Sequence, residues 1–166
     1  MYHLVNCGIT IDEHDEKYFR EHRPKTLIAH AGEMDVRIHL GADPSKIRLE
    51  WITTYIGKII EFAELYSIGR VIIATPIRPV SSTCRSIGFN ANGSDKMRVE
   101  ASKRIEDLVA KAIHDLGEPR LTFLLTSSLQ MRSSDVLDLE DTSDGVHASL
   151  SYTRLVRAEV KSMTKI

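Results

Sequence analysis

The chain has 166 residues and a formal net charge of −1 at pH 7; 42% of the residues are apolar and 27% are charged. This length suits one domain with a sizeable core, and the composition is ordinary for a soluble globular protein. The charge balance provides no basic field of the kind that binds nucleic acid. No apolar run approaches the roughly 20 residues that cross a bilayer. We therefore expect neither nucleic acid nor a membrane as a partner.

The N-terminal residues MYHLVNCGIT lack the basic start and the long apolar stretch of a secretory signal peptide. The two cysteines, Cys7 and Cys84, do not make a disulfide framework. Both observations favour a reducing, cytoplasmic location as the default expectation. A longer N-terminus, which would remove this default, is one of two interpretations of the motifs considered below.

The first part of the chain alternates short apolar runs with polar segments. Residues 2–5 form an apolar run before Asn6 and Gly8, which predicts a strand entering a turn. Residues 12–22 are polar and charged, as in a short exposed helix. The run Thr26–His30 (TLIAH) is apolar without alternation, which is typical of a parallel strand buried on both faces.

The clearest helix start lies at Asp43 and Pro44. Aspartate is a favoured N-cap, and proline fits the first helical position because its missing N–H is not needed there. Apolar residues then recur at helical spacing up to about Tyr66, and Gly69 is expected to end the segment. The buried side of this helix is predicted to hold Ile52, Ile56, Ile59 and Ala63.

The second half of the chain continues the alternation. The apolar runs Arg70–Thr75 and Leu121–Thr126 predict two further strands. Ser94 is the expected N-cap of a long helix between them, and Gly117 is its expected C-terminal stop. Residues 150–163 predict a closing helix. Strands that alternate with helices predict one α/β domain, with a parallel sheet of about four strands covered on both faces.

Long loops follow the predicted strands Thr26–His30, Arg70–Thr75 and Leu121–Thr126. They leave the carboxyl ends of the strands, where open α/β sheets bind ligands, and long loops in compact domains are often functional. Three short motifs follow strands in this way: NCGIT (Asn6–Thr10), AGEMDVR (Ala31–Arg37) and DGVH (Asp144–His147). Taken singly, each fits an ordinary turn or a polar loop with a surface ion pair.

Together and in this order, the motifs resemble sequence blocks of the SGNH, or GDSL-type, hydrolase superfamily. NCGIT is similar to the second block, whose glycine N–H helps to form an oxyanion hole; that glycine is Gly8 here. AGEMDVR, which includes Gly32, occupies the place of the third block and is similar to the GEID-C-R variant of proteins associated with polysaccharide modification. DGVHASLSYTRL resembles the fifth block, Asp-x-x-His, followed by the last helix.

The resemblance covers nearly the whole chain from Asn6 onward. It implies a flavodoxin-like three-layer α/β/α sandwich and one SGNH hydrolase-like domain over residues 1–166. It further implies hydrolysis or transfer of acyl esters without a cofactor or a metal. The substrate is expected to be a small molecule or a carbohydrate ester, such as an O-acetylated sugar. The oligomeric state is left open.

The spacing of Asp144 and His147 has a chemical reason in this interpretation. A neutral imidazole must take a proton from a hydroxyl nucleophile and return it to the leaving group. A carboxylate bonded to the other ring nitrogen fixes the tautomer and stabilises the imidazolium. An aspartate three residues earlier can reach that nitrogen on a tight turn, which Gly145 permits. We therefore predict His147 as the general base and Asp144 as the group that orients it.

The sequence departs from the family pattern at its start. The family nucleophile lies in a Gly-Asp-Ser turn that precedes the second block, and this tripeptide occurs nowhere in the chain. Two interpretations follow: either the chain is an N-terminally truncated form, or residues 2–5 form the central strand of a smaller sheet. In the second case Cys7 would lie near the place of the nucleophile, where His147 could activate it as a thiolate. The alternative for Cys7 is a small buried residue at a strand end.

A second departure lies in AGEMDVR, where Met34 replaces the asparagine that donates a hydrogen bond to the oxyanion. Arg37 is the nearest side chain that could supply a donor instead, although it could equally pair with Glu33 or Asp35. The resemblance implies that Gly32, Glu33, Asp35 and Arg37 shape the oxyanion and substrate-binding side of the site.

Two interpretations from other classes remain. His30, Glu33, Asp35 and His39, together with Asp144 and His147, carry the donor atoms of a metal site, although their spacing matches no trusted ligand pattern. An SGNH-like domain without its serine could also bind a glycan or a protein without turning it over, because fold similarity does not establish activity.

Overall fold

The computed structural model describes residues 13–30, 43–76, 92–126 and 150–163. Its sheet is formed by the parallel strands β1 (Thr26–His30), β2 (Arg70–Ala74) and β3 (Leu121–Leu124), in the order β1-β2-β3. This parallel arrangement confirms the prediction of an α/β fold. The strand predicted at residues 2–5 lies outside the described residues.

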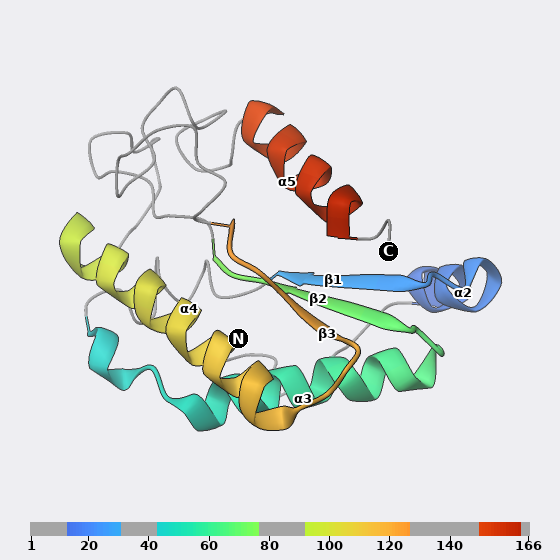
Figure 1. Cartoon of the computed structure of the whole chain (residues 1–166), viewed down its shortest axis with the longest axis horizontal. Coiled ribbons are helices and arrows are strands. Elements are labelled where there is room, and N and C mark those ends of the chain that lie inside the picture. The colour runs from blue at the N-terminus through green and yellow to red at the C-terminus, as the bar shows by residue number, and fades with distance from the viewer. Residues whose placement is uncertain (1–12, 31–42, 77–91, 127–149, 164–166) are drawn as a thin grey trace.

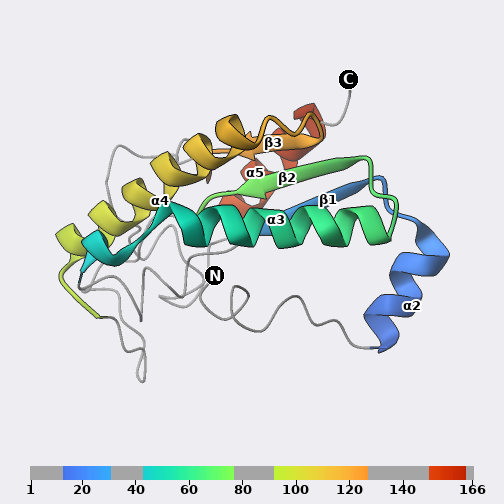
Figure 2. The same cartoon turned by 90° about the horizontal axis from the view of Figure 1, so that it is seen from below.

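Helices cover both faces of the sheet (Figures 1 and 2). Helices α3 (Leu49–Leu65) and α4 (Asp95–Leu116) lie on one face, and α5 (Leu150–Met163) lies on the other. The alternation of side chains along β2 explains this arrangement, because successive residues of a strand point to opposite faces. Val71 and Ile73 pack in the α3–α4 core, whereas Ile72 and Ala74 pack with α5. The three-layer α/β/α architecture is thereby confirmed.

Helix α2 (Glu13–His22) begins and ends within one residue of the prediction. Its outer surface is polar, but it is anchored to α3 by an aromatic cluster. The ring of Phe19 lies 5.1 Å from Phe62, edge to face, and 5.1 Å from Tyr66. Such ring pairs stabilise a contact beyond the area that they bury. The cluster therefore holds α2 against the C-terminal end of α3.

None of the helices in the described ranges is both long and apolar enough to span a membrane.

The predicted helix start at Asp43 is wrong. Pro44–Lys46 form only a short 3-10 turn, Asp43 makes no capping hydrogen bond to the backbone, and α3 begins at Leu49. Ile47 interrupts the helix with an extended backbone (φ −73°, ψ 119°). Its side chain is 1% exposed in the core, and its carbonyl accepts a hydrogen bond of 3.0 Å from Arg104 Nε on α4. Tertiary packing of Ile47 therefore overrides the local capping signal.

The two ends of α4 follow the sequence signals. Ser94 has an extended backbone, and its hydroxyl accepts a hydrogen bond of 3.3 Å from the N–H of Met97. Gly117 adopts the left-handed conformation (φ 59°), and its N–H donates to the carbonyl of Ile113. Both predicted caps are confirmed, because the side-chain acceptor and the glycine satisfy backbone groups that a helix leaves without partners.

Helix α3 ends before Gly69, in a Schellman motif. The N–H of Ser67 donates to the carbonyl of Glu64, and the N–H of Ile68 donates to that of Ala63 at 2.8 Å. Ser67 occupies the left-handed position of the motif, with φ 55°. Glycine is the usual residue there because a Cβ atom is strained at positive φ. The sequence signal at Gly69 therefore lay two residues beyond the actual stop.

Replacing Ser67 with glycine should stabilise the protein. Relief of the left-handed strain is expected to raise the free energy of unfolding by about 1 kcal/mol, or Tm by roughly 2–4 °C. Thermal unfolding of Ser67→Gly beside Ser67→Ala measures the effect, since alanine keeps the strain. A lower Tm for Ser67→Gly than for the wild type would refute the assignment of strain to this position.

The turn between α4 and β3 is held by an ion-pair cluster. Arg120 Nε and Nη2 donate to the Glu118 carboxylate at 2.8 and 3.0 Å, and Nη2 also reaches Glu64 on α3 at 3.0 Å. These hydrogen bonds lower the pKa of Glu118 to about 2. Because the pKa in the folded state lies below that of the unfolded chain, the pair stabilises the fold above about pH 4.5, and this contribution disappears as the pH falls toward 2.

Glu118→Gln should therefore change how the free energy of unfolding depends on pH under acidic conditions. We expect the variant to be less stable than the wild type at pH 7, and the difference to shrink progressively below about pH 4.5. Urea unfolding at pH 7, 4.5 and 3 measures it. Glu100→Gln, an exposed α4 carboxylate without an ion pair among the described residues, is the matched control. A Glu118→Gln deficit that stays constant with pH would contradict the role of the carboxylate charge.

Candidate active site

The carboxyl ends of the three strands are level with one another at one edge of the sheet. His30 of β1 is in register with Ala74 of β2, and Ala74 is in register with Leu124 of β3. The chain leaves these strands into residues 31–42, 77–91 and 127–149. This edge is where parallel α/β sheets assemble their sites from loops that follow strands.

The predicted site residues all lie outside the described residues. They belong to residues 1–12, 31–42 and 127–149. Their geometry is therefore left as predicted, and the described residues define the strand ends and helices that flank them. The residues concerned are Cys7, Gly8, Gly32, Glu33, Asp35, Arg37, Asp144 and His147.

A buried pair of threonines joins the ends of β2 and β3. Thr75 is 0% exposed and Thr126 is 1% exposed, and their hydroxyl oxygens lie 3.1 Å apart. The N–H of Thr126 donates to Thr75 Oγ1 at 3.0 Å. Thr126 Oγ1 lies 2.8 Å from the carbonyl oxygen of Thr75 and 3.0 Å from that of Pro76. We refer to Thr75 and Thr126 as the threonine pair.

The threonine pair fixes the point at which two segments of the chain leave the sheet. Residues 77–91 follow directly after Pro76, and residues 127–149, which contain Asp144 and His147, follow directly after Thr126. Buried hydroxyls are costly unless hydrogen bonded, so this network favours one backbone arrangement over its alternatives. The pair thus fixes the strand end from which the chain continues toward the predicted catalytic residues.

Helix α5 begins shortly after the predicted catalytic residues. His147 precedes the first residue of α5, Leu150, by three positions. Among the described side chains of α5, Val156, Val160 and Met163 pack on the sheet, against Ile72, Ala74 and Leu124.

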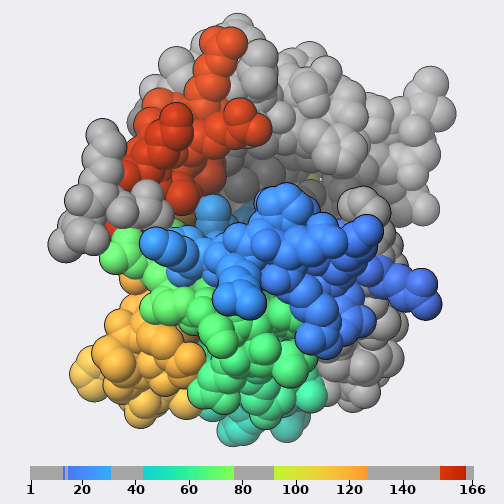
Figure 3. Space-filling view, turned by 90° about the vertical axis from the view of Figure 1, so that its right-hand side faces the viewer, coloured from blue at the N-terminus to red at the C-terminus, as the bar shows by residue number. Residues whose placement is uncertain are grey.

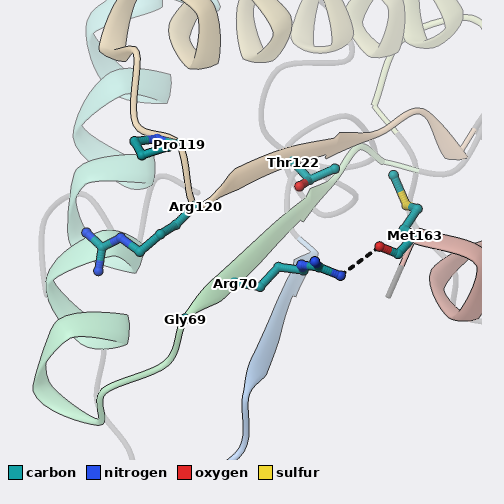
Figure 4. A pocket seen from close by; sticks show the side chains of 6 residues that line it. All are labelled: Gly69, Arg70, Pro119, Arg120, Thr122 and Met163. Atoms are coloured by element: carbon teal, nitrogen blue, oxygen red, sulfur yellow. Dashed lines mark hydrogen bonds between the residues drawn. The ribbon is translucent and has the colours of Figure 1, made fainter. Parts of the chain in front are cut away.

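At the far end of α5, Arg70 Nη1 donates a hydrogen bond of 2.7 Å to the carbonyl of Met163 (Figure 4). A cation beside the last carbonyls of a helix is favourable because it complements the helix dipole. The same arginine lines a hollow of about 400 Å³ with Arg120 and Thr122. This hollow lies at the amino edge of the sheet, so it is not the predicted active site.

The N-terminus of α4 also lies at the carboxyl edge, because α4 follows the loop that leaves β2 (Figure 1). Arg98, in the first turns of α4, is only 1% exposed and forms an ion pair with Asp95. A buried guanidinium requires carboxylate or carbonyl acceptors around it. An ion pair between Arg98 and Asp95 therefore lies at the same end of the sheet as the predicted site.

The metal interpretation gains no support from the part of the chain that the structure describes. His30 is exposed at the end of β1, but Glu33, Asp35 and His39 lie outside the described residues. Within the described ranges, no three histidine, cysteine, aspartate or glutamate side chains come together as a ligand group.

Three residues at this edge were missed by the sequence reasoning: Thr75, Thr126 and Arg98. The signal available for the threonines is their position, since β-branched hydroxyl residues at the ends of two successive apolar strands indicate a cross-strand hydrogen bond. Arg98 interrupts the apolar stripe of α4 at helical spacing from Ala101 and Ile105, which was the available signal for a buried charge.

Two solved structures share this architecture. A GDSL-like lipase from Bacteroides thetaiotaomicron aligns with a TM-score of 0.56 and 18% identity, over 89% of this chain and 67% of the lipase chain. A predicted acylhydrolase from Bacteroides fragilis aligns with a TM-score of 0.58 and 20% identity, over 89% of this chain and 66% of its own. No family model and no curated protein matches the sequence. The chain therefore has the fold of GDSL-like hydrolase structures, and it spans about two thirds of the length of these two.

Proposed function

We propose that this chain, which has the fold of the GDSL-like hydrolases, is an ester hydrolase or acyl transferase. The observation that carries the proposal is the placement of the motifs. AGEMDVR directly follows β1, and DGVH lies between the threonine pair of β2 and β3 and the start of α5. Parallel strands bring such loops to one edge, which is where GDSL-like folds and other open α/β folds place their chemistry.

In this proposal His147 is the general base and Asp144 orients it. The imidazole removes the proton from the nucleophile as it attacks the ester carbonyl, and then returns that proton to the leaving alcohol. The N–H of Gly8 donates to the oxyanion that develops on the carbonyl oxygen. Gly32, Glu33, Asp35 and Arg37 shape the substrate-binding side from the loop after β1.

The nucleophile is unassigned, because the sequence contains no Gly-Asp-Ser. Cys7 is the candidate within the chain: a thiol activated by His147 would attack as a thiolate and form a thioester. The proposed substrates are acyl esters, with O-acetyl groups on carbohydrate as the leading class because AGEMDVR resembles the GEID-C-R variant.

The absence of Gly-Asp-Ser from the sequence also supports a second function. The chain would then be a non-catalytic GDSL-like domain that binds a glycan or a protein. The two functions make opposite predictions for turnover, so one comparison separates them.

The experiment measures acetate release from p-nitrophenyl acetate and from an acetylated oligosaccharide, with binding of the same oligosaccharide followed by calorimetry. The proposed hydrolase releases acetate above the uncatalysed rate. Oligosaccharide binding without acetate release would favour the binding domain. Cys7→Ser, assayed in parallel, abolishes turnover if the thiol is the nucleophile and leaves it intact if Cys7 is only a packed side chain.

A further inference from the structure

A separate hollow lies at the amino edge of the sheet, at the end remote from the predicted active site. It lies between the C-terminal ends of α2 and α3 and the start of β1, and its volume is about 570 Å³. Figure 3 faces this side, with α2 and the start of β1 in blue beside the end of α3 in green. Small-molecule sites commonly have this size. The described residues that line it are Phe19, Arg20, Arg23, Lys25, Leu65, Tyr66 and Ser67.

The charge of this hollow is positive and only partly compensated. The described lining contains three cationic side chains and no carboxylate. Arg20 is engaged by Glu16 at 2.6 Å. Arg23 and Lys25 are exposed, and neither forms an ion pair with another described residue. By contrast, the cations of the neighbouring hollow are satisfied, since Arg70 binds the carbonyl of Met163 and Arg120 binds Glu118.

An aromatic ring and an exposed leucine lie beside these cations, and the guanidinium carbon of Arg20 lies 6.0 Å from the centre of the Tyr66 ring. The ring of Tyr66 is held by Phe19 at 5.1 Å and by Phe62 at 4.8 Å, so its orientation is fixed before any ligand arrives. Leu65 next to it is 69% exposed, the most exposed large apolar side chain of the described residues. A ring or another flat apolar group could therefore stack here while a charged group meets the cations.

The backbone of the hollow is strained at two positions. Within the described ranges, Arg23 (φ 43°) and Ser67 (φ 55°) are the only residues other than glycine with positive φ, and both line this hollow. The N–H of Arg23 donates to the carbonyl of Phe19, which completes the C-terminal turn of α2. Glycine would complete that turn without strain. Strained residues concentrate at ligand sites, where the side chain has a use that offsets the strain.

We propose that this hollow binds a small phosphate monoester whose ester group carries a flat ring. The phosphate dianion lies between Arg23 and Lys25, because guanidinium and ammonium groups together match its charge and its several acceptor oxygens. The ring lies on Tyr66 and Leu65. The site is independent of ester hydrolysis at the opposite edge, and its occupancy requires no turnover.

Calorimetric titration of the wild-type chain with phenyl phosphate, inorganic phosphate and benzoate tests the ligand class. We expect phenyl phosphate to bind with one-to-one stoichiometry, and about three- to tenfold more tightly than inorganic phosphate because of the added ring contact. Benzoate, with a single charge, should bind more weakly than phenyl phosphate. Absence of phenyl phosphate binding, or equal affinity for inorganic phosphate, would overturn the proposal.

Variants at Arg23 test the site itself. Arg23→Gly should weaken phenyl phosphate binding by about tenfold or more, since a charge-assisted contact is lost, while Tm of the ligand-free protein rises because the left-handed strain is relieved. Arg23→Ala should weaken binding equally without the gain in Tm, so the loss cannot be attributed to the fold. Lys111→Ala removes an exposed α4 cation and should leave binding unchanged. Wild-type affinity in Arg23→Gly, or an equal loss in Lys111→Ala, would refute the site.

Discussion

Replacing His147 with alanine is expected to reduce acyl ester hydrolysis by about 10³-fold or more, which would leave little above the uncatalysed rate. Without the imidazole, no group takes the proton from the nucleophile or returns it to the leaving alcohol. Initial rates of acetate release from p-nitrophenyl acetate measure the change. We expect Tm of the variant to stay close to that of the wild type, so that a loss of rate cannot be attributed to a loss of fold.

His114→Ala is the matched control for this measurement. His114 lies near the C-terminal end of α4, its side chain is 90% exposed, and its loss should leave the rate unchanged. Hydrolysis that survives in His147→Ala would remove His147 from the mechanism. The double variant Asp144→Ala/His147→Ala adds a test of the dyad, because residues that act as one unit are not additive. It should be no slower than His147→Ala alone.

Replacing Thr126 with valine is expected to lower the free energy of unfolding by about 2–3 kcal/mol, or Tm by roughly 5–10 °C. Valine has nearly the same shape but lacks the hydroxyl, so the buried groups that Thr126 Oγ1 contacts lose a partner. These groups are Thr75 Oγ1 and the carbonyl oxygens of Thr75 and Pro76. Urea or thermal unfolding measures the effect.

Thr126→Ser should restore most of this stability, because serine keeps the hydroxyl. Thr54→Val is the matched surface control, since Thr54 Oγ1 donates to the Glu50 carbonyl on an exposed side of α3. It should stay within about 0.5 kcal/mol of the wild type. A Thr126→Val protein as stable as the wild type would show that the threonine pair does not hold the two strand ends. Faster amide exchange over residues 127–149 in Thr126→Val would connect the pair to the loop of Asp144 and His147.

The elements that the sequence predicted well have purely local or periodic causes. Apolar runs marked β1, β2 and β3, but burial on both faces holds only for β2, in which Val71–Ala74 are buried. The prediction that Thr26–His30 is buried on both faces is wrong, because only Ala29 of β1 is buried and Ile28 is 47% exposed. Ser94 and Gly117 marked the ends of α4, because capping depends on a few neighbouring atoms. The helix start predicted at Asp43 was wrong for the opposite reason. The same local signal was overruled by Ile47, whose burial and hydrogen bond to Arg104 involve a helix more than fifty residues away.

The sequence offers a candidate dyad, but not the contacts that support the neighbouring strand ends. Asp144 and His147 are three positions apart, which the sequence shows directly, and their catalytic role stays a prediction. The threonine pair joins residues 51 positions apart, and its role appears only when β2 and β3 lie side by side. The same holds for Arg98, whose burial depends on what packs around α4.

By itself, the sequence determined the alternation of strands and helices and the α/β class, because these depend on periodicity and on short spacings. Ester chemistry is what the resemblance of its motifs to the SGNH hydrolases implies. Only the tertiary structure decided that the threonine pair joins two strands at the carboxyl edge of the sheet. It also decided which residues meet in the hollow at the amino edge. Arg23 and Ser67, 44 positions apart, share one hollow only because Phe19 packs α2 against the end of α3. Such meetings arise from the burial of apolar surface between distant segments, for which no local pattern of residues is a signal.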